Sequence, residues 1–338
     1  MMEILENFSL KNHNTFGIDV RARRFVAIHS IEELRKVLAE NRGENIFILG
    51  GGSNMLLTRD VDALVVHVDL RGKEIVDTDE HHATLVGMAG ENWHEFVMFA
   101  IRNGLGGLEN MSLIPGNVGT TPIQNIGAYG AEIKDTMLWC EALDTETLEL
   151  RRFSNAECRF GYRDSIFKNE AKGKYVITAV AFRLTVAHHR INTGYGDITR
   201  MLADRQIENP TIKDVSEAVI AIRQSKLPDP KVLGNSGSFF KNPVIPESLY
   251  RIASQKFPDM PHYPAGDGMV KVPAGWLIEQ AGFKGKRFGD AGMHKNQALV
   301  LVNYGGASGA ELLAVARDVQ RTVKEMFGIE IEAEVNIV

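Results

Sequence analysis

Apolar residues recur at helical spacing in three segments of the chain, and residues suited to helix ends flank them. Residues 30–40 and 308–328 each open with a serine followed three positions later by a glutamate, the spacing of a capping box. Residues 211–226 form the third predicted helix, which should end before Pro228. Gly328 is the expected C-terminal cap of the last helix. The residues expected on the buried faces are Ile31, Leu34, Val37 and Leu38; Val215, Val219 and Ile222; and Leu312, Val315, Val319, Val323 and Met326.

Most of the remaining apolar pattern consists of short runs typical of β-strands. These runs are residues 45–49, 63–68, 82–90, 175–186, 297–304 and 329–338. The pattern contains no internal repeat and no low-complexity tract. Residues 227–237 are rich in Pro and Gly, and we interpret them as a linker between domains.

Length, charge and cysteine content narrow the class of protein. At 338 residues the chain exceeds the size at which single cores stop growing, so two or three domains are expected. The formal net charge of −5 argues against a surface for nucleic acid or anionic membranes. Cys140 and Cys158 are the only cysteines and form no CxxC motif, which favours a reduced cytosolic protein over a disulfide scaffold. Residues 1–12 lack the pattern of a signal peptide, and no apolar run approaches the roughly 18 residues of a membrane span.

Three consecutive glycines at residues 50–52 follow a predicted strand and precede Ser53 and Asn54. Glycine in a structured segment costs roughly 0.5–1 kcal/mol relative to alanine, so bare backbone must be needed there. A dinucleotide-binding βαβ unit is excluded, because only seven residues, 56–62, separate this loop from the next strand. The loop is either a nest of backbone N–H groups for an anion or a tight turn without a ligand. In the first case, a β-branched residue at Gly51 should block the nest and resist a positive φ.

A second glycine-rich segment, residues 112–131, contains no charged side chain. Its glycines lie among Ser, Thr, Asn and Gln, a composition too glycine-rich for a core helix. Backbone amides and small hydroxyls of this kind can surround a diphosphate with neutral donors. The alternative is a buried irregular loop, whose backbone polar groups would still need partners.

Seven ordered motifs together resemble the UDP-N-acetylenolpyruvoylglucosamine reductases, and the resemblance covers the chain from Asn14 to Val338. The motifs are NTFGID (14–19), ILGGGSNML (48–56), IPGNVGTTPIQNIGAYG (114–130), FGYRDSIFK (160–168), GSFFKNP (237–243), VPAGWLIEQAG (272–282) and HKNQALVLVN (294–303). Any one of these motifs would be weak, whereas their order makes the resemblance specific.

The resemblance implies an α+β fold with an FAD-binding module of the vanillyl-alcohol-oxidase (PCMH) type and a C-terminal α/β substrate-binding domain. It divides the chain into FAD-binding subdomains at 1–68 and 69–224, the second with a tyrosine loop, and a substrate domain at 225–338 whose last strand returns to the active site. It implies FAD and NADPH as cofactors. FAD should be non-covalent, because Ser53 and Asn54 stand where related oxidases carry a linking histidine. The implied FAD-binding residues are Gly50, Gly51, Gly52, Ser53, Asn54, Pro115, Gly116, Gly119, Thr120, Asn125, Gly127, Ala128 and Arg223.

The family reduces an enolpyruvyl sugar nucleotide for peptidoglycan synthesis, and three positions match its catalytic residues. Arg163 resembles the arginine that holds the substrate carboxylate, Glu334 the acid that assists enol formation, and Ser238 the proton donor. Without the resemblance, these would be a turn with a surface Arg–Asp pair, the solvent face of a strand and a loop serine. Ser236 stands where many relatives have alanine, and whether it can substitute for Ser238 stays open.

The resemblance also implies substrate contacts, with Tyr195 closing over the nucleotide. The implied substrate-binding residues are Tyr195, Lys226, Asn242, Tyr263, Lys271 and Gln297. The resemblance implies a cytoplasmic protein that is a monomer. Its implied partners are the UDP-sugar and NADPH, and neither nucleic acid nor a membrane is expected to bind. The adjacent histidines at 81–82 and 188–189 point to opposite faces of a strand, so no metal site is expected. The alternatives are an FAD-dependent sugar or alcohol oxidase and a non-catalytic protein that binds nucleotide sugars.

Overall fold

The computed structural model describes residues 3–338, which form two compact units. The first unit contains residues 3–8, Ala22–Gly51 and Asp62–Ser225, and the second contains Ser9–Arg21, Gly52–Val61 and Lys226–Val338. The division falls inside the triple glycine, between Gly51 and Gly52. The three-domain division implied by the motifs stays a prediction.

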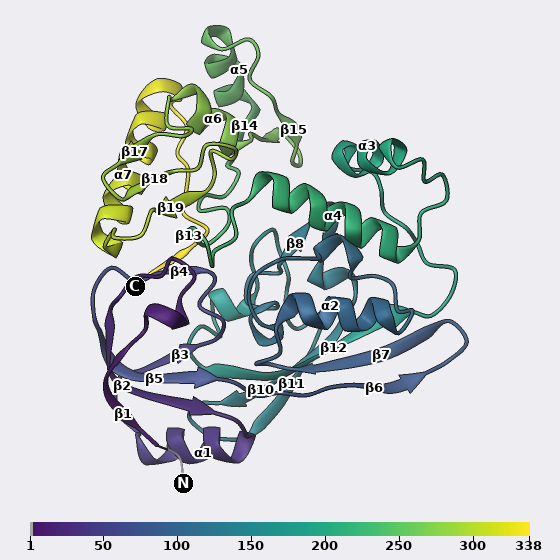
Figure 1. The fold of residues 1–338 in the computed structure, drawn as a ribbon, viewed down its shortest axis with the longest axis vertical. Coiled ribbons are helices and arrows are strands. Elements are labelled where there is room, and N and C mark those ends of the chain that lie inside the picture. The colour runs from purple at the N-terminus through teal and green to yellow at the C-terminus, as the bar shows by residue number, and fades with distance from the viewer. Residues whose placement is uncertain (1–2) are drawn as a thin grey trace. The chain divides into compact units, whose positions relative to one another are not determined.

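A four-stranded sheet and one helix begin the first unit (Figure 1). The sheet has the order β1 (Leu5–Ser9), β2 (Arg21–Ile28), β5 (Val61–Val68) and β3 (Ile46–Leu49). Helix α1 (Ile31–Glu40) covers it with Leu34, Val37 and Leu38, which are buried. As predicted, Ser30 accepts the Glu33 N–H. The Glu33 carboxylate, however, accepts the N–H of His29 rather than that of Ser30.

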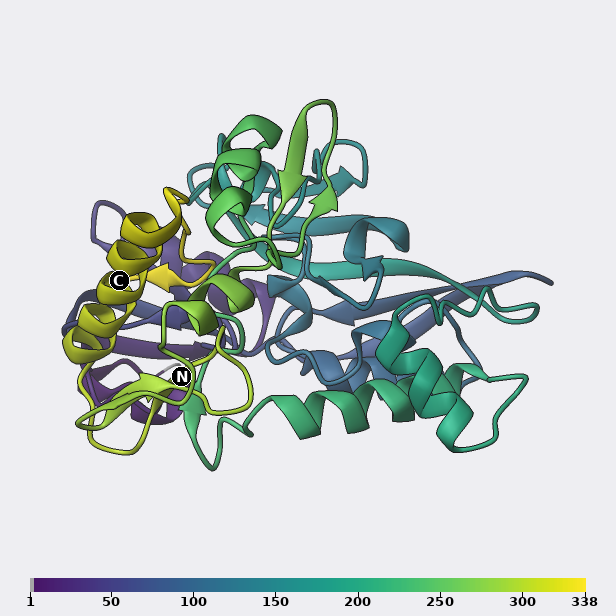
Figure 2. The same cartoon turned by 90° about the horizontal axis from the view of Figure 1, so that it is seen from above.

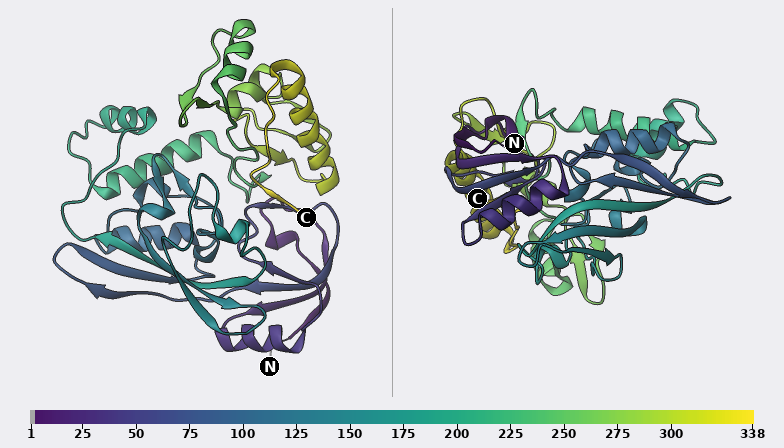
Figure 3. Two further views of the ribbon diagram at one scale, coloured as in Figure 1. Left: turned by 180° about the vertical axis from the view of Figure 1, so that it is seen from behind. Right: turned by 90° about the horizontal axis from the view of Figure 1, so that it is seen from below.

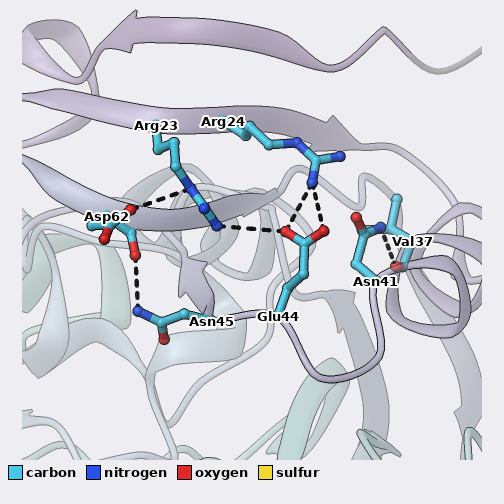
Figure 4. Close-up of polar contacts among 7 residues, drawn as sticks. All are labelled: Arg23, Arg24, Val37, Asn41, Glu44, Asn45 and Asp62. Carbon is cyan, nitrogen blue, oxygen red and sulfur yellow. Dashed lines mark hydrogen bonds and ion pairs between the residues drawn. The ribbon is translucent and has the colours of Figure 1, made fainter.

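The strand that leads into the triple glycine is fixed by polar contacts at its start. Figure 4 shows Glu44 accepting two hydrogen bonds from Arg24 at 2.8 and 2.9 Å, with Arg23 at 3.5 Å. Asn45 donates to the carbonyl of Asp62 on β5 at 3.0 Å. β3 and β5 are parallel neighbours, joined without a crossover helix, as the short spacing between them predicts.

A five-stranded antiparallel sheet forms the rest of the first unit. Its order is β11 (Leu150–Ser154), β10 (Met137–Asp144), β12 (Tyr175–Thr185), β7 (His82–Met88) and β6 (Lys73–Thr78). Figure 3 shows β6 and β7 as an extended hairpin. Helix α2 (Trp93–Arg102) buries Trp93 and Phe96 against Phe182 of β12.

Helices α3 (Gly196–Asp204) and α4 (Ile212–Lys226) complete this unit. Figures 1 and 2 show α4 beside α2, and the Ser216 hydroxyl lies 3.8 Å from the Met98 sulfur between these helices. The predicted stripe of α4, Val215, Val219 and Ile222, is buried. Two short strands, β8 (Gly127–Ala128) and β9 (Ala131–Glu132), pair within the second glycine-rich segment.

The second unit contains three small sheets and three helices. The sheets are β13 (Gly234–Asn235), β19 (Leu301–Asn303), β18 (Ala291–Met293) and β17 (Arg287–Phe288); β14 (Val244–Pro246), β16 (Met269–Lys271) and β15 (Tyr263–Pro264); and β20 (Asn336–Ile337) with β4 (Met55–Leu56). The helices are α5 (Glu247–Lys256), α6 (Ala274–Gln280) and α7 (Gly309–Phe327). Helix α7 packs on β18, β19 and α6.

The ends of α7 confirm the predicted capping box at Ser308 and Glu311 and the left-handed cap at Gly328, whose φ is 69°. One position of its stripe is wrong, because Met326 is exposed and the following Phe327 is buried instead. In the last turn of the helix, the buried face therefore lies one residue later than the pattern predicts.

Several expected strands are shorter than predicted, and four helices were not expected. Within residues 329–338 only β20 is a strand, and within 297–304 only β19 is. Residues 227–237 are not a free linker, because Asn235 is buried in β13 and its amide donates to the carbonyls of Pro228 and Leu233. Helices α2, α3, α5 and α6 lie in segments for which no helix was predicted.

Candidate active site

The two glycine-rich loops lie against each other in the first unit. A Cβ atom at Gly50 would lie 2.6 Å from Thr120 Cγ2, and one at Gly51 would lie 2.8 Å from Asn117 Oδ1 and 3.2 Å from Gly116 Cα. Loop packing is therefore one reason for bare backbone at these positions. A cradle built from glycine backbone suits an anionic group such as a diphosphate, because side chains do not cover its amides.

The positive φ that we expected at Gly51 occurs at Gly52 instead, with a value of 62°. A Cβ atom at Gly52 would overlap the carbonyl of His13, and the Gly52 carbonyl accepts the Thr15 N–H at 3.1 Å. The missing side chain at Gly52 therefore lets this residue pack directly against residues 13–15 of the second unit. A β-branched residue at Gly51 would therefore be unfavourable because it clashes with the other loop, and not because of the backbone φ angle.

Some backbone groups of the second glycine-rich segment form hydrogen bonds that hold the segment in place. The N–H groups of Val118 and Gly119 donate to the carbonyls of Glu91 and Ala89, each at 2.9 Å. A Cβ atom at Gly119 would overlap Ala89. Thr120 closes the turn by donating its hydroxyl to the Asn117 carbonyl at 2.7 Å. These residues hold the loop in shape, and the amides of Val118 and Gly119 are already used.

Arg163 reaches back from the FGYRDS turn to this same segment. Its guanidinium donates to the Gly127 carbonyl at 2.7 Å and to the Asn125 carbonyl at 3.4 Å. Asn125 is buried, and its amide donates to the Gly161 carbonyl at 2.9 Å and to Glu132 at 3.1 Å. The Asn125 side-chain oxygen accepts the N–H of Lys134. Asn125 therefore joins the arginine turn to the glycine-rich segment.

Tyr195 stands at the start of α3 with 53% of its surface exposed. Its ring meets that of Tyr129 edge-on, with centroids 5.8 Å apart and an interplanar angle of 77°. The buried Asn110 amide donates to the carbonyls of Tyr129 and Asn192, at 3.0 and 2.9 Å. The tyrosine loop is thus attached to the end of the second glycine-rich segment. The sequence reasoning missed Asn110 and Tyr129, although Tyr129 lies within a quoted motif.

Arg223 on α4 contacts the start of the same segment. Its Nε donates to the Leu113 carbonyl at 3.3 Å. Burial lowers the pKa of Arg223 and raises the pKa of Tyr129, and the two groups interact electrostatically. A guanidinium does not lose its proton in proteins, so Arg223 remains a cation.

In the second unit, the backbone brings Ser238 and Glu334 to neighbouring positions. Phe240 forms an antiparallel bridge with Ala333, and the Glu334 N–H donates to the Phe239 carbonyl at 2.8 Å. This register sets Glu334 opposite Phe239 and Ser238 opposite Val335, so Ser238 and Glu334 are one residue apart along the pair. The two predicted acids therefore belong to one unit and Arg163 to the other.

Asn54 is bound to the C-terminal segment within the second unit. Its carbonyl accepts the backbone and side-chain N–H groups of Asn336 at 3.1 and 3.0 Å. Its own amide points to the Glu334 carbonyl at 3.5 Å. Asn54 therefore supports the backbone that carries Glu334.

The two serines near this segment differ in environment. Ser238 is exposed, whereas Ser236 is 8% exposed and its hydroxyl has no hydrogen-bond partner among residues 3–338. An enclosed hydroxyl cannot reach a substrate without a rearrangement of the loop. The structure therefore offers no direct route by which Ser236 replaces Ser238.

Four predicted substrate-binding residues lie on two features of the second unit. Asn242 accepts the Ala274 N–H at 2.9 Å at the start of α6, where Pro273 has no side-chain acceptor to cap the helix. The Gln297 side-chain oxygen lies 3.4 Å from the Cβ position of Gly275 on the same helix. Tyr263 and Lys271 are directly opposite each other on β15 and β16, so their side chains share one face.

The remaining predicted residues lie in or beside these features. Pro115 and Gly116 are in the second glycine-rich segment, Gly127 and Ala128 form β8, Ser53 follows Gly52, and Lys226 ends α4. Across residues 3–338, no helix combines the length and apolar character needed to cross a bilayer. The same residues contain no group of three or more His, Cys, Asp or Glu placed to hold a metal ion.

Comparisons with known proteins match this arrangement along the chain. Residues 229–338 match the C-terminal domain of UDP-N-acetylenolpyruvoylglucosamine reductase, and residues 22–152 match an FAD binding domain. The chain is 64% identical over 337 residues to the UDP-N-acetylenolpyruvoylglucosamine reductase of Flavobacterium johnsoniae, with 100% of both chains covered. It is 52% identical to that of Chromobacterium violaceum, with 98% of both covered.

A solved structure shows the same fold. The UDP-N-acetylenolpyruvylglucosamine reductase of Thermus caldophilus superimposes with a TM-score of 0.65 at 24% identity, covering 100% of this chain and 98% of that one. Together with the domain matches, this confirms the predicted α+β class, with an FAD-binding domain of the PCMH type and a distinct C-terminal domain.

Proposed function

Because this chain belongs to the UDP-N-acetylenolpyruvoylglucosamine reductase family, we propose that it reduces this sugar nucleotide with NADPH through bound FAD. The observation that carries the proposal is the 64% identity to a reductase over the full length of both chains. The paired glycine-rich loops of the first unit support it, since bare backbone packed as these loops are suits a diphosphate.

When bound, FAD supplies hydride transfer between NADPH and the vinyl carbon of the enolpyruvyl group. We assign the FAD diphosphate to the loops at residues 50–54 and 115–120. Asn125 joins the second glycine-rich segment to the Arg163 turn through the hydrogen bond from its side chain to the Gly161 carbonyl. We expect FAD to be held without a covalent bond.

The reaction places negative charge on the substrate beside its carboxylate, so a cation and a proton donor are needed there. In this proposal Arg163 holds the carboxylate, and its left-handed backbone, with φ of 54°, is maintained by the contacts to Asn125 and Gly127. Ser238 delivers the proton to the carbon beside the carboxylate. Glu334 assists the enol, and its backbone is held opposite Phe239, the residue that follows Ser238.

The nucleotide part of the substrate is assigned to the second unit and the tyrosine loop. Tyr263 and Lys271 present a hydroxyl and an ammonium from one face of their strands, which suits a diphosphate. Asn242 and Gln297 present amides at the start of α6. Tyr195, half exposed, is free to close over the nucleotide.

We further propose that the protein works as a cytoplasmic monomer in the synthesis of peptidoglycan precursors. The sequence contains only two cysteines and no CxxC motif, a content that favours a reducing compartment. Size-exclusion chromatography with light scattering measures the mass in solution against the 37.5 kDa of one chain.

The deciding experiment separates the two halves of the reaction. The purified yellow protein is mixed with NADPH without oxygen, and the loss of visible flavin absorbance is followed. Addition of UDP-N-acetylenolpyruvoylglucosamine should then restore the absorbance. Restoration only by air, with no response to the sugar nucleotide, would instead indicate an oxidase and overturn the proposal.

A further inference from the structure

The start of the second glycine-rich segment is held by two helices of the first unit. From α2, the Trp93 backbone N–H donates to the Gly116 carbonyl at 3.0 Å, and the Trp93 indole donates to the Met111 carbonyl at 3.0 Å. From α4, the Ser216 hydroxyl lies 2.8 Å from that of Ser112. The segment just before the assigned FAD contacts is therefore tied to a rigid framework.

Leu113 is the unusual residue of this segment. Its φ is 60°, a left-handed conformation that a branched side chain rarely adopts. Both of its backbone polar groups are held by side chains. Its N–H donates to His94 Nδ1 at 3.0 Å, and its carbonyl accepts Arg223 Nε at 3.3 Å. Side chains from two helices thus hydrogen-bond to the backbone of Leu113, which lies two positions before Pro115.

The bond to Leu113 determines the protonation state that His94 can have. An imidazole nitrogen accepts a hydrogen bond only when it carries no proton, so the proton must reside on Nε2. A doubly protonated ring would point a second N–H at the N–H of Leu113. The contact is therefore present in the neutral ring and lost in the imidazolium.

The surroundings of His94 favour the neutral ring. Burial lowers the pKa of His94, and the Arg223 cation on α4 lowers it further, while Glu95 on its own helix acts in the opposite direction. Residues 111–116, the segment whose Leu113 N–H contacts the ring, contain no charged side chain. His94 is thus neutral above the ordinary imidazole pKa of about 6.5.

We propose that His94 is a positioning residue for FAD, which holds Leu113 and the following Pro115–Gly116 turn in shape and releases them when its ring is protonated. The inference rests on the proposed assignment of FAD to this loop. Because the pKa of His94 is lowered in the folded protein, the neutral ring keeps its bond to Leu113 below the ordinary imidazole value and loses it as pH falls through the lowered pKa. FAD should therefore leave the protein faster once pH falls below that lowered pKa.

The test follows FAD release from the holoprotein after dilution, by the rise in flavin fluorescence, at about pH 4.5 and about pH 7.5, because the buried ring is protonated only well below the ordinary imidazole pKa of about 6.5. Wild type should release FAD about fivefold faster at the lower pH, equivalent to one hydrogen bond of about 1 kcal/mol. His94→Asn keeps an acceptor near the Nδ1 position but cannot titrate, so its release should be slow at both values. His94→Phe has no acceptor and should release FAD fast at both.

His82→Asn is the matched control, because His82 lies on β7 and contacts Arg183, away from Leu113. It should keep the pH dependence of wild type. Equal release of FAD by wild type at both pH values, or an unchanged pH dependence in His94→Asn, would overturn the inference. A wild-type protein that binds no FAD would overturn the proposed function instead.

Nitrogen NMR of histidine-labelled wild type provides a test that needs no variant. The His94 ring should show the Nε2–H tautomer at neutral pH. Its titration should coincide with the rise in FAD release. The Nδ1–H tautomer, or a titration that does not follow FAD release, would contradict the positioning role.

Discussion

Replacing Gly51 by alanine should weaken FAD binding by about thirtyfold, because it pushes the two glycine-rich loops apart. The new Cβ would lie 2.8 Å from Asn117 Oδ1 and 3.2 Å from Gly116 Cα, whereas ordinary contacts begin at 3.4 Å. The Asn117 side chain caps the 3-10 turn Val118–Thr120 by accepting the Thr120 N–H. Its displacement loses a cap worth about 1 kcal/mol, and overpacking against the Gly116 backbone costs at least about 1 kcal/mol more.

The sum of about 2 kcal/mol corresponds to about thirtyfold in a dissociation constant. The assay is titration of apoprotein with FAD, followed by quenching of flavin fluorescence, together with thermal unfolding. Gly51→Val should be worse, because its second branch has no space between the loops.

Gly196→Ala is the matched control, since no atom lies within 4 Å of the Cβ position of Gly196 and its φ is not in the left-handed range. Its FAD affinity should stay within about twofold of wild type, the usual range for a surface substitution. If Gly51→Ala binds FAD as tightly as this control and unfolds at the same temperature, then close packing of the loops is not what positions the cofactor.

Four further predictions concern other parts of the chain. Ser238→Ala should slow reoxidation of the flavin by the sugar nucleotide about 10²–10⁴-fold in stopped-flow, as for a lost general acid, and leave its reduction by NADPH within a few-fold. Equal slowing of both steps would remove Ser238 from that role. Ser236→Ala should keep both rates and raise the free energy of unfolding by about 1 kcal/mol, because it removes a buried hydroxyl without a partner; a loss of stability would show that the hydroxyl is satisfied. Tyr195→Phe should raise KM for the sugar nucleotide about two- to tenfold, for one neutral hydrogen bond, and a collapse of kcat at constant KM would place Tyr195 in the chemistry. Cys140 and Cys158 should react with a thiol reagent only after unfolding, because both are fully buried and the neighbouring Cys158 thiol and burial raise the pKa of Cys140; rapid modification of the native protein would contradict this burial.

Local sequence determined the features whose partners lie within one helical turn. The capping serines at 30 and 308, the glycine cap at 328 and the stripe of α4 all appear where the pattern predicts them. A cap depends on a side chain and an amide three residues away, so no knowledge of the fold is needed. The seven motifs likewise identify the family, because their order along the chain is itself specific.

Helix α2 is an element that the sequence does indicate and that the prediction missed. Its buried residues Trp93, Phe96, Val97, Ala100 and Ile101 follow the spacing i, i+3, i+4, i+7 and i+8 of an amphipathic helix. Asn92 caps the helix by accepting the Glu95 N–H, which is a second local signal.

The C-terminal segment shows the opposite error. Its alternating residues predicted a continuous strand, yet only Asn336–Ile337 pairs with β4 and only Ala333 pairs with Phe240. A strand forms where a partner offers its backbone, and the partners here come from two separate places in the chain. The alternating pattern alone could not show that the pairing of this segment is interrupted between Ala333 and Asn336.

Only the tertiary structure decided how the site is supported. Gly51 meets Asn117, Asn110 meets Asn192 and Asn125 meets Gly161, and each pair is separated by tens of residues in the chain. Sequence motifs could identify the residues of the glycine-rich loops. They could not show that the N–H groups of Val118 and Gly119 donate to the carbonyls of Glu91 and Ala89. Such contacts depend on which backbone groups packing brings together, because every buried amide must find a partner wherever the fold provides one.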